Sequence, residues 1–147
     1  AKHKGTSFVE IYQNCNIFND GTFSAIYERS VREDRILRLK HGEVLVFGKD
    51  KNKGIRMRGL KPVIVDLDKD FNEKDLLIHD QYCEDSALAN LLSGFDYPDF
   101  PVPMGIFRQV ENSTYGEKIE EQIKTQIEKK GVGNLAKLLR GNQVWTS

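Results

Sequence analysis

The stretch KGTSFVEIYQNCNIFND, residues 4–20, determines how the rest of the chain is interpreted. Its first half is a short run of β-forming residues: Phe8, Val9, Ile11 and Tyr12. Such a crowded apolar run is typical of a strand covered on both faces, so we expect a strand over residues 6–12. Cys15 follows at the carboxyl end of that strand, where open α/β sheets gather their chemistry. The pattern therefore predicts a cysteine loop at a candidate site.

The residues before this stretch predict the end of a helix. Lys2, His3 and Lys4 place cationic side chains just ahead of Gly5, as in the last turn of a helix closed by glycine. The body of that helix would lie upstream of Lys2. We therefore expect the chain to open part-way through a domain.

The composition is that of an ordinary globular chain. Its 147 residues are 39% hydrophobic and 30% charged, which suits one domain or part of one. The 22 basic and 22 acidic residues balance, so no global field attracts nucleic acid. No apolar run approaches the roughly 20 residues of a membrane helix. The two cysteines are too few for a disulfide scaffold and predict a reducing cytoplasm.

The middle of the chain predicts an antiparallel β meander over residues 35–67. The apolar run 44–47 and the alternating run 55–58 flank a lysine-rich, glycine-bounded loop, which is typical of a β-hairpin. The loop lysines raise a phosphate-binding hypothesis, but the spacing fails the P-loop pattern because Ile55 and Arg56 follow Gly54. The simpler interpretation is that they keep a hairpin tip soluble.

Helix signals concentrate in the last third of the chain. Thr114 and Glu117 form a capping box that opens a helix over 115–130. That helix carries an apolar stripe at four-residue intervals: Tyr115, Ile119, Ile123 and Ile127. A last helix follows Asn134, with Leu135, Leu138 and Leu139 expected to face inward.

Shorter features complete the expected fold. We expect a helix over 86–92, one helical turn over 23–27, a charged loop over 32–35 and a half-exposed strand over 37–40. The three prolines of segment 96–103 predict an extended strap packed across the domain surface.

The remaining candidates for chemistry are weak. His79 and Asp80 are adjacent and so point opposite ways on an extended chain, which favours a structural histidine. Carboxylates surround Cys83 and disfavour its thiolate, so we expect it to be inert. The three histidines share no metal-ligand spacing. The residues by themselves indicate no base–nucleophile pair and no phosphate cradle.

The chain resembles the carboxyl-terminal part of the β subunit of 2-oxoacid:ferredoxin oxidoreductases, most closely the 2-oxoglutarate branch. The resemblance covers nearly the whole chain and rests on His3-Lys4-Gly5, Phe8-Val9-Glu10-Ile11, Gln13-Asn14-Cys15, Phe18-Asn19, His41-Gly42-Glu43, Val46-Phe47-Gly48-Lys49-Asp50, Lys53-Gly54-Ile55-Arg56, His79-Asp80, Phe100-Pro101-Val102-Pro103, Gly105 and Trp145. It implies an α/β fold: the end of a thiamine-diphosphate-binding parallel-sheet domain over residues 1–20, then a carboxyl-terminal extension over 21–147 with an antiparallel β meander and terminal helices.

The resemblance also implies a function. Such enzymes oxidatively decarboxylate a 2-oxoacid on thiamine diphosphate and Mg²⁺, pass electrons through a [4Fe–4S] cluster to ferredoxin and transfer the acyl group to coenzyme A. Their Gly-Asp-Gly motif for thiamine and metal has no counterpart here, so we assign no catalytic or thiamine-binding residue to this chain and expect it to be inactive alone. Its expected partners are the upstream half of the β subunit, the α subunit and ferredoxin, with neither nucleic acid nor membrane.

By the same resemblance, Cys15 would supply the fourth ligand of the [4Fe–4S] cluster. Asn14, Asn16 and Asn19, with the free backbone N–H groups around them, would hydrogen-bond the sulfurs. Asn14 departs from the proline often found at that position in the family. Two alternatives stay open, namely a non-catalytic subunit-docking module and the pyruvate-specific branch of the family.

Overall fold

The computed structural model describes residues 3–69 and 75–141, and it divides into two compact units. The first comprises Ala1–Val9 with Glu111–Ser147, and the second comprises Glu10–Val110. Lys2 and Trp145 lie outside the described residues. None of the helices in the described ranges is long and apolar enough to cross a membrane.

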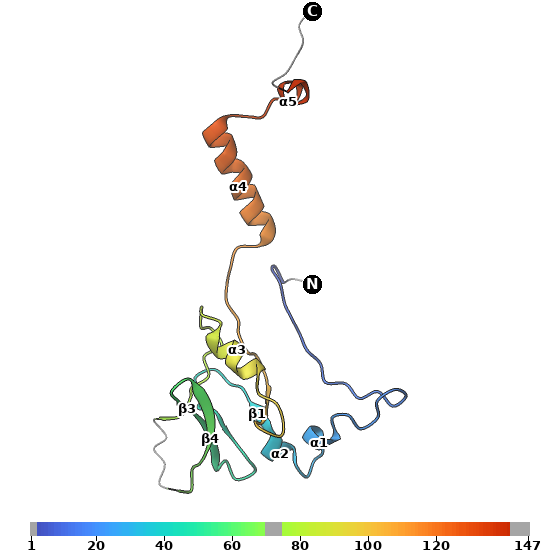
Figure 1. Ribbon diagram of the computed structural model, residues 1–147, viewed down its shortest axis with the longest axis vertical. Helices are drawn as coiled ribbons and strands as arrows, with labels where there is room; N and C mark the ends of the chain where they lie inside the picture. The colour runs from blue at the N-terminus through green and yellow to red at the C-terminus, as the bar shows by residue number, and fades with distance from the viewer. Residues whose placement is uncertain (1–2, 70–74, 142–147) are drawn as a thin grey trace, which may run out of the picture. The chain divides into compact units, whose positions relative to one another are not determined.

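The larger unit contains the predicted hairpin inside a three-stranded antiparallel sheet (Figure 1). Strand β2 (Val46–Phe47) pairs with β3 (Lys53–Arg58), which in turn pairs with β4 (Lys61–Asp66). Val46 lies opposite Gly54, and Gly54 lies opposite Val65. The hairpin and the meander from residue 46 to residue 66 are therefore confirmed.

The first strand of the predicted meander belongs elsewhere. Strand β1 (Ile36–Arg38) pairs in parallel with β5 (Val102–Met104), not with the antiparallel sheet. The prediction of one meander over 35–67 was wrong at this end because Ile36 and Leu37 are both buried and need cover on two sides. The proline segment supplies the partner strand.

The carboxyl end of the proline segment lies in the interior, where Pro101, Val102 and Pro103 are buried, whereas residues 96–99 are exposed. The prediction of a strap across the surface was therefore wrong for residues 101–103. Close packing fixes its end: a Cβ added at Gly105 would lie 2.8 Å from the carbonyl oxygen of Leu39. Gly105 also has φ +138°, a conformation that favours glycine.

The core of the larger unit is a cluster drawn from β1, β2, β3, helix α3 (Ala87–Ser93) and the residues beside them. Its buried members are Leu37, Leu39, Leu45, Phe47, Ile55, Leu92 and Phe95. Phe95 stacks on Phe100, with their ring centroids 4.5 Å apart. Burying apolar side chains of this size contributes roughly 1.5–3 kcal/mol each, which makes this cluster the main stabilising element.

Two short helices precede β1. Helix α1 (Ser24–Tyr27) confirms the predicted helical turn, whereas helix α2 (Arg32–Arg35) replaces the predicted charged loop. Ion pairs explain the difference, because Glu33 lies 3.1 Å from Arg38 and Asp34 lies 3.4 Å from Lys53. These partners come from strands, so the pattern of residues 32–35 alone does not reveal them.

The smaller unit carries helix α4 (Tyr115–Lys130) and helix α5 (Leu135–Arg140). The capping box is confirmed, since Thr114 Oγ1 accepts from the Glu117 N–H and Glu117 accepts from the Thr114 N–H. Helix α5 begins at its predicted cap, where Asn134 Oδ1 accepts from the Lys137 N–H at 2.9 Å. The predicted burial of its leucines was wrong. Leu135, Leu138 and Leu139 are exposed, and no residue of this helix is buried.

Residues 6–12 do not form the predicted strand. They pair with no other segment in the part of the chain that the structure describes, and Phe8 is 90% exposed. A strand needs a neighbour to satisfy its backbone groups, and none of the described strands takes that place. The apolar pattern correctly marks a segment suited to burial but not its partner.

Candidate functional site

The cysteine loop is a tight turn that begins at Cys15. The Asn19 N–H donates to the Cys15 carbonyl at 3.0 Å, which closes the turn. The Cys15 thiol is free and exposed at the surface. The loop therefore presents one accessible sulfur on a defined backbone.

The side chain of Asn14, the residue before Cys15, stabilises this turn through hydrogen bonds to residues within it and after it. Its Nδ2 donates to Oδ1 of Asn16 at 2.7 Å and to Oδ1 of Asp20 at 2.8 Å. Its Oδ1 accepts from the Gly21 N–H at 2.9 Å. One side chain thus joins the two ends of the loop, a local role typical of asparagine.

Backbone donors surround the sulfur. The backbone N–H groups of Phe18, and after it of Ile17 and Asn19, lower the pKa of the Cys15 thiol by their attraction for its charged form. Hydrogen bonds to the charged form favour that form, so the turn stabilises a thiolate. Thiolate is the form that attacks electrophiles and binds metals. The Asn14 and Asn16 side chains bond within the loop, and the expected hydrogen bonds to the sulfurs of a cluster stay a prediction.

The loop lies within an exposed apolar stretch. Its large exposed side chains are Phe8, Val9, Ile11, Ile17 and Phe18. Tyr12 and Phe23 stack with ring centroids 4.7 Å apart and so anchor the loop beside α1. The thiol is thus accessible, and Ile17 and Phe18, which follow it closely in the chain, leave an apolar surface that suits cover by another surface.

The cysteine loop can supply one ligand of an iron–sulfur cluster, the Cys15 thiolate. Such clusters are held by four ligands, usually cysteine thiolates. Within residues 3–69 and 75–141, no three His, Cys, Asp or Glu residues converge on a point where a metal could bind. Cys15 can therefore serve a cluster only together with ligands from outside this chain's described part.

His79 has the structural position expected from the sequence. It is fully buried, its Nε2 lies 2.8 Å from the Ile106 carbonyl, and its N–H donates to the Glu43 carbonyl at 2.9 Å. The short contact to a carbonyl oxygen places the proton on Nε2. Nδ1 is buried without a hydrogen-bond partner among the described residues.

A different histidine pairs with Asp80. His41 Nδ1 lies 3.4 Å from Asp80 Oδ1, and the Tyr82 ring meets the His41 ring edge-on at 4.7 Å. The Tyr82 N–H also donates to Asp80 Oδ1 at 2.9 Å. Sequence reasoning missed this cluster because His41 and Asp80 are distant in the chain and no local pattern links them. Both side chains are about half exposed, so the pair belongs to the surface.

The other sequence candidates stay apart from Cys15. Cys83 is half-buried, and its carbonyl accepts from Nε of Arg108 at 3.1 Å. In the lysine-rich hairpin loop, Lys53 pairs with Asp34 across to α2. These residues share no contact with the cysteine loop.

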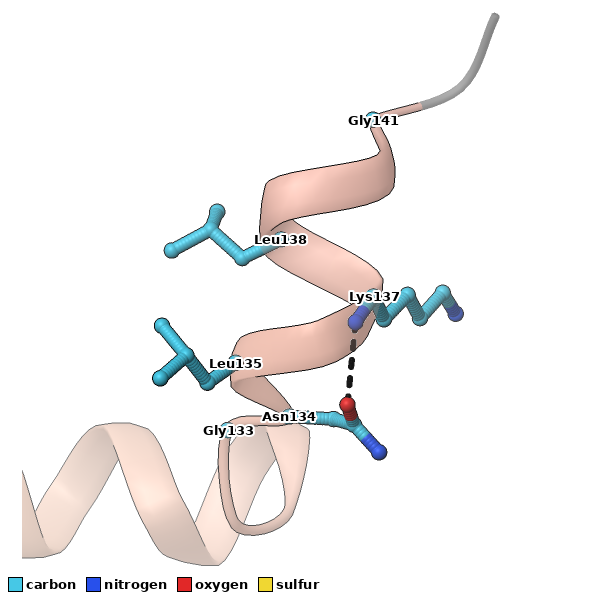
Figure 2. A pocket seen from close by; sticks show the side chains of 6 residues that line it. All are labelled: Gly133, Asn134, Leu135, Lys137, Leu138 and Gly141. Carbon is cyan, nitrogen blue, oxygen red and sulfur yellow. Dashed lines mark hydrogen bonds between the residues drawn. The ribbon is translucent and has the colours of Figure 1, made fainter. Parts of the chain in front are cut away.

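Figure 2 shows a shallow hollow along α5. Leu135 and Leu138 project to one side of the helix, and Lys137 projects away from them. The hollow is lined by Gly133, Asn134, Leu135, Lys137, Leu138 and Gly141. The hollow offers one cation and no convergent polar set, so it lacks the features of a ligand site.

Comparison with known proteins gives one informative relationship. The chain is 31% identical to the 2-oxoglutarate oxidoreductase subunit KorB of Mycobacterium tuberculosis over 154 aligned residues. The alignment covers 99% of this chain but only 39% of that subunit, so the chain spans about two fifths of the relative's length. No protein-family model matches the chain, and no solved structure matches it. The relationship confirms the resemblance predicted from the sequence.

Proposed function

Because the chain belongs to the family of 2-oxoglutarate oxidoreductase subunits, we propose that it is the carboxyl-terminal part of such an enzyme's β subunit. The complete enzyme oxidatively decarboxylates 2-oxoglutarate to an acyl-CoA and delivers the electrons to ferredoxin. The 31% identity, in an alignment that covers 99% of the chain, carries this proposal. The relative's substrate favours 2-oxoglutarate over pyruvate.

Within that enzyme, Cys15 is the fourth ligand of a [4Fe–4S] cluster. The turn at residues 15–19 supports this role because its backbone N–H groups stabilise a thiolate. The cluster, when bound, supplies one-electron transfer. The other three ligands come from the upstream half of the subunit, which also holds thiamine diphosphate and Mg²⁺.

The chain's own residues fix and shield the ligand. Asn14 holds the turn closed through its bonds to Asn16, Asp20 and Gly21. The exposed Ile17 and Phe18 pack against the upstream half and exclude water from the sulfur. Residues 6–12 become a strand there, at the edge of the thiamine-binding sheet. The division after residue 20 is part of the same proposal.

A non-catalytic docking role is the second candidate, and the exposed apolar stretch at Phe8, Val9 and Ile11 favours it. Under this hypothesis Cys15 has no ligand role, and the segment only joins the upstream half to the α subunit. The two functions make opposite predictions for the thiol.

The deciding experiment compares two matched variants of the complete αβ enzyme. We expect Cys15→Ser to remove the cluster's visible absorption and stop ferredoxin reduction, because one thiolate ligand is lost. Cys83→Ser is the control and should leave both signals unchanged. An intact cluster spectrum in Cys15→Ser would reject the ligand role and favour the docking module.

The second experiment tests whether the chain alone is inactive. Titration calorimetry with thiamine diphosphate and Mg²⁺ should detect no binding, since the chain lacks the Gly-Asp-Gly motif. Micromolar binding to the isolated chain would contradict the assignment of cofactor binding to the upstream half.

A further inference from the structure

Helix α4 (orange in Figure 1) carries a mostly exposed apolar stripe. Tyr115, Ile123 and Ile127 are exposed by 83%, 54% and 44%, and Ile119 is half-buried. Residues four apart on a helix lie on one face, so the four side chains form one narrow seam. A seam of this width matches the contact between two paired helices.

The charges of α4 are divided between its two halves. The amino-terminal half carries Glu117, Glu120 and Glu121 against one lysine, and the carboxyl-terminal half carries Lys124, Lys129 and Lys130 against one glutamate. Two copies in antiparallel orientation therefore place each acidic half beside a basic half. A parallel pair would set like charges together. The helix dipoles also favour the antiparallel arrangement.

The spacing of the stripe is compatible with two-fold symmetry. In an antiparallel pair centred on Glu121, Tyr115 of one copy lies level with Ile127 of the other, and Ile119 lies level with Ile123. Glu120 and Lys124 lie on one flank of the stripe. Along the contact the order is Lys124 of the second copy, Glu120, Glu120 of the second copy and Lys124, so each glutamate has a lysine of the other copy as one neighbour. A two-fold contact needs such a self-complementary surface.

The flanking charges are available for this contact. No ion pair joins Glu120 to Lys124 within the helix in the described structure, although their i,i+4 spacing predicts one.

We propose that α4 is a self-association surface that pairs antiparallel with α4 of a second copy of this chain. The inference does not rest on the proposed enzyme function. A helix of 16 residues is about 24 Å long and buries less than the roughly 800 Å² per partner of a standard interface. The dimer is therefore weak and forms at high micromolar concentration.

Sedimentation velocity of the full chain over a concentration series tests the pairing. Wild type should shift from monomer to dimer as concentration rises. Glu120→Lys alone and Lys124→Glu alone should each lose the dimer, because like charges then line the flank in both copies. An equimolar mixture of the two variants should recover it, since the two lysines of one copy then alternate with the two glutamates of the other. We expect at least about tenfold tighter association in the mixture than in either variant.

The mixture separates pairing from effects on the helix itself, because mixing cannot change the charges within one copy. Circular dichroism of each variant measures its helix content. The matched control is a mixture of Glu28→Lys and Lys61→Glu, which carry the same net charges as the first pair at exposed positions outside α4. A wild type that stays monomeric throughout, or recovery that is equal in the control mixture, would overturn the proposal.

Discussion

Nδ2 of Asn14 and Oδ1 of Asp20 lie 2.8 Å apart and close the cysteine loop from outside. The same asparagine accepts from the Gly21 N–H at 2.9 Å, so one side chain spans the loop. The backbone donors that surround the Cys15 sulfur depend on that closed geometry. Asn14 is thus a positioning residue for the thiolate.

Replacing Asn14 by alanine should therefore make Cys15 less reactive. Without its three hydrogen bonds the turn opens more often, the backbone donors leave the sulfur, and the pKa of the thiol rises toward its ordinary value. Iodoacetamide should then alkylate Cys15 more slowly at neutral pH, as measured by mass spectrometry. The control is Asn19→Ala in the same loop, because that side chain makes no hydrogen bond in the described structure. Equal rates in the two variants would contradict the role of Asn14.

A second prediction tests the backbone donor directly. Proline at position 18 removes the N–H that contributes most to lowering the pKa of Cys15, whereas Phe18→Ala keeps it. Thiolate exists above the pKa and is lost below it. In a Cys83→Ser background, the thiolate absorbance of Phe18→Pro should therefore appear at higher pH than in wild type. Phe18→Ala should titrate like wild type, and a coincident titration of all three chains would refute the donor's effect.

Local patterns accounted for the elements that depend on nearby residues. The capping box at Thr114 and Glu117 and the cap at Asn134 act within one helical turn, so the sequence alone predicts both helix starts. The hairpin of β2 and β3 likewise needs only its own alternation and a polar loop. The position of Cys15 in a loop belongs to the same class.

Features set by distant partners were not predictable in this way. The pairing of Ile36 with Val102 and the contact of His41 with Asp80 join segments far apart in the chain. For residues 6–12 the apolar pattern indicates burial, but the described residues provide no neighbouring strand, and Phe8 remains exposed. Periodicity describes which face a segment buries, not which segment covers it.

The buried histidine yields a stability prediction. His79 is fully buried and bonded to the Ile106 carbonyl, so His79→Ala should leave a cavity and lose that hydrogen bond. We expect a loss of about 2–4 kcal/mol in the free energy of unfolding, as for other large-to-small core substitutions. His41→Ala is the control, and it should cost less than about 1 kcal/mol because its contact with Asp80 is half exposed. Urea denaturation measures both, and comparable losses would argue against a structural role for His79.

The contact between Gly105 and Leu39 yields the last prediction. A Cβ at residue 105 would lie 2.8 Å from the Leu39 carbonyl oxygen and 3.0 Å from its Cβ, and the backbone there has φ +138°. Both conditions oppose any side chain, and the nearest atom is the backbone carbonyl oxygen of Leu39, directly after β1, which cannot turn aside as a flexible side chain would. Gly105→Ala should therefore lower the free energy of unfolding by about 1–3 kcal/mol. Gly94→Ala is the matched control in the same unit, because its φ is −85° and its Cβ would meet nothing closer than 3.5 Å. Thermal and urea unfolding should thus separate the two alanine variants, and equal stability would show that β1 and β5 pair less tightly than the structure indicates.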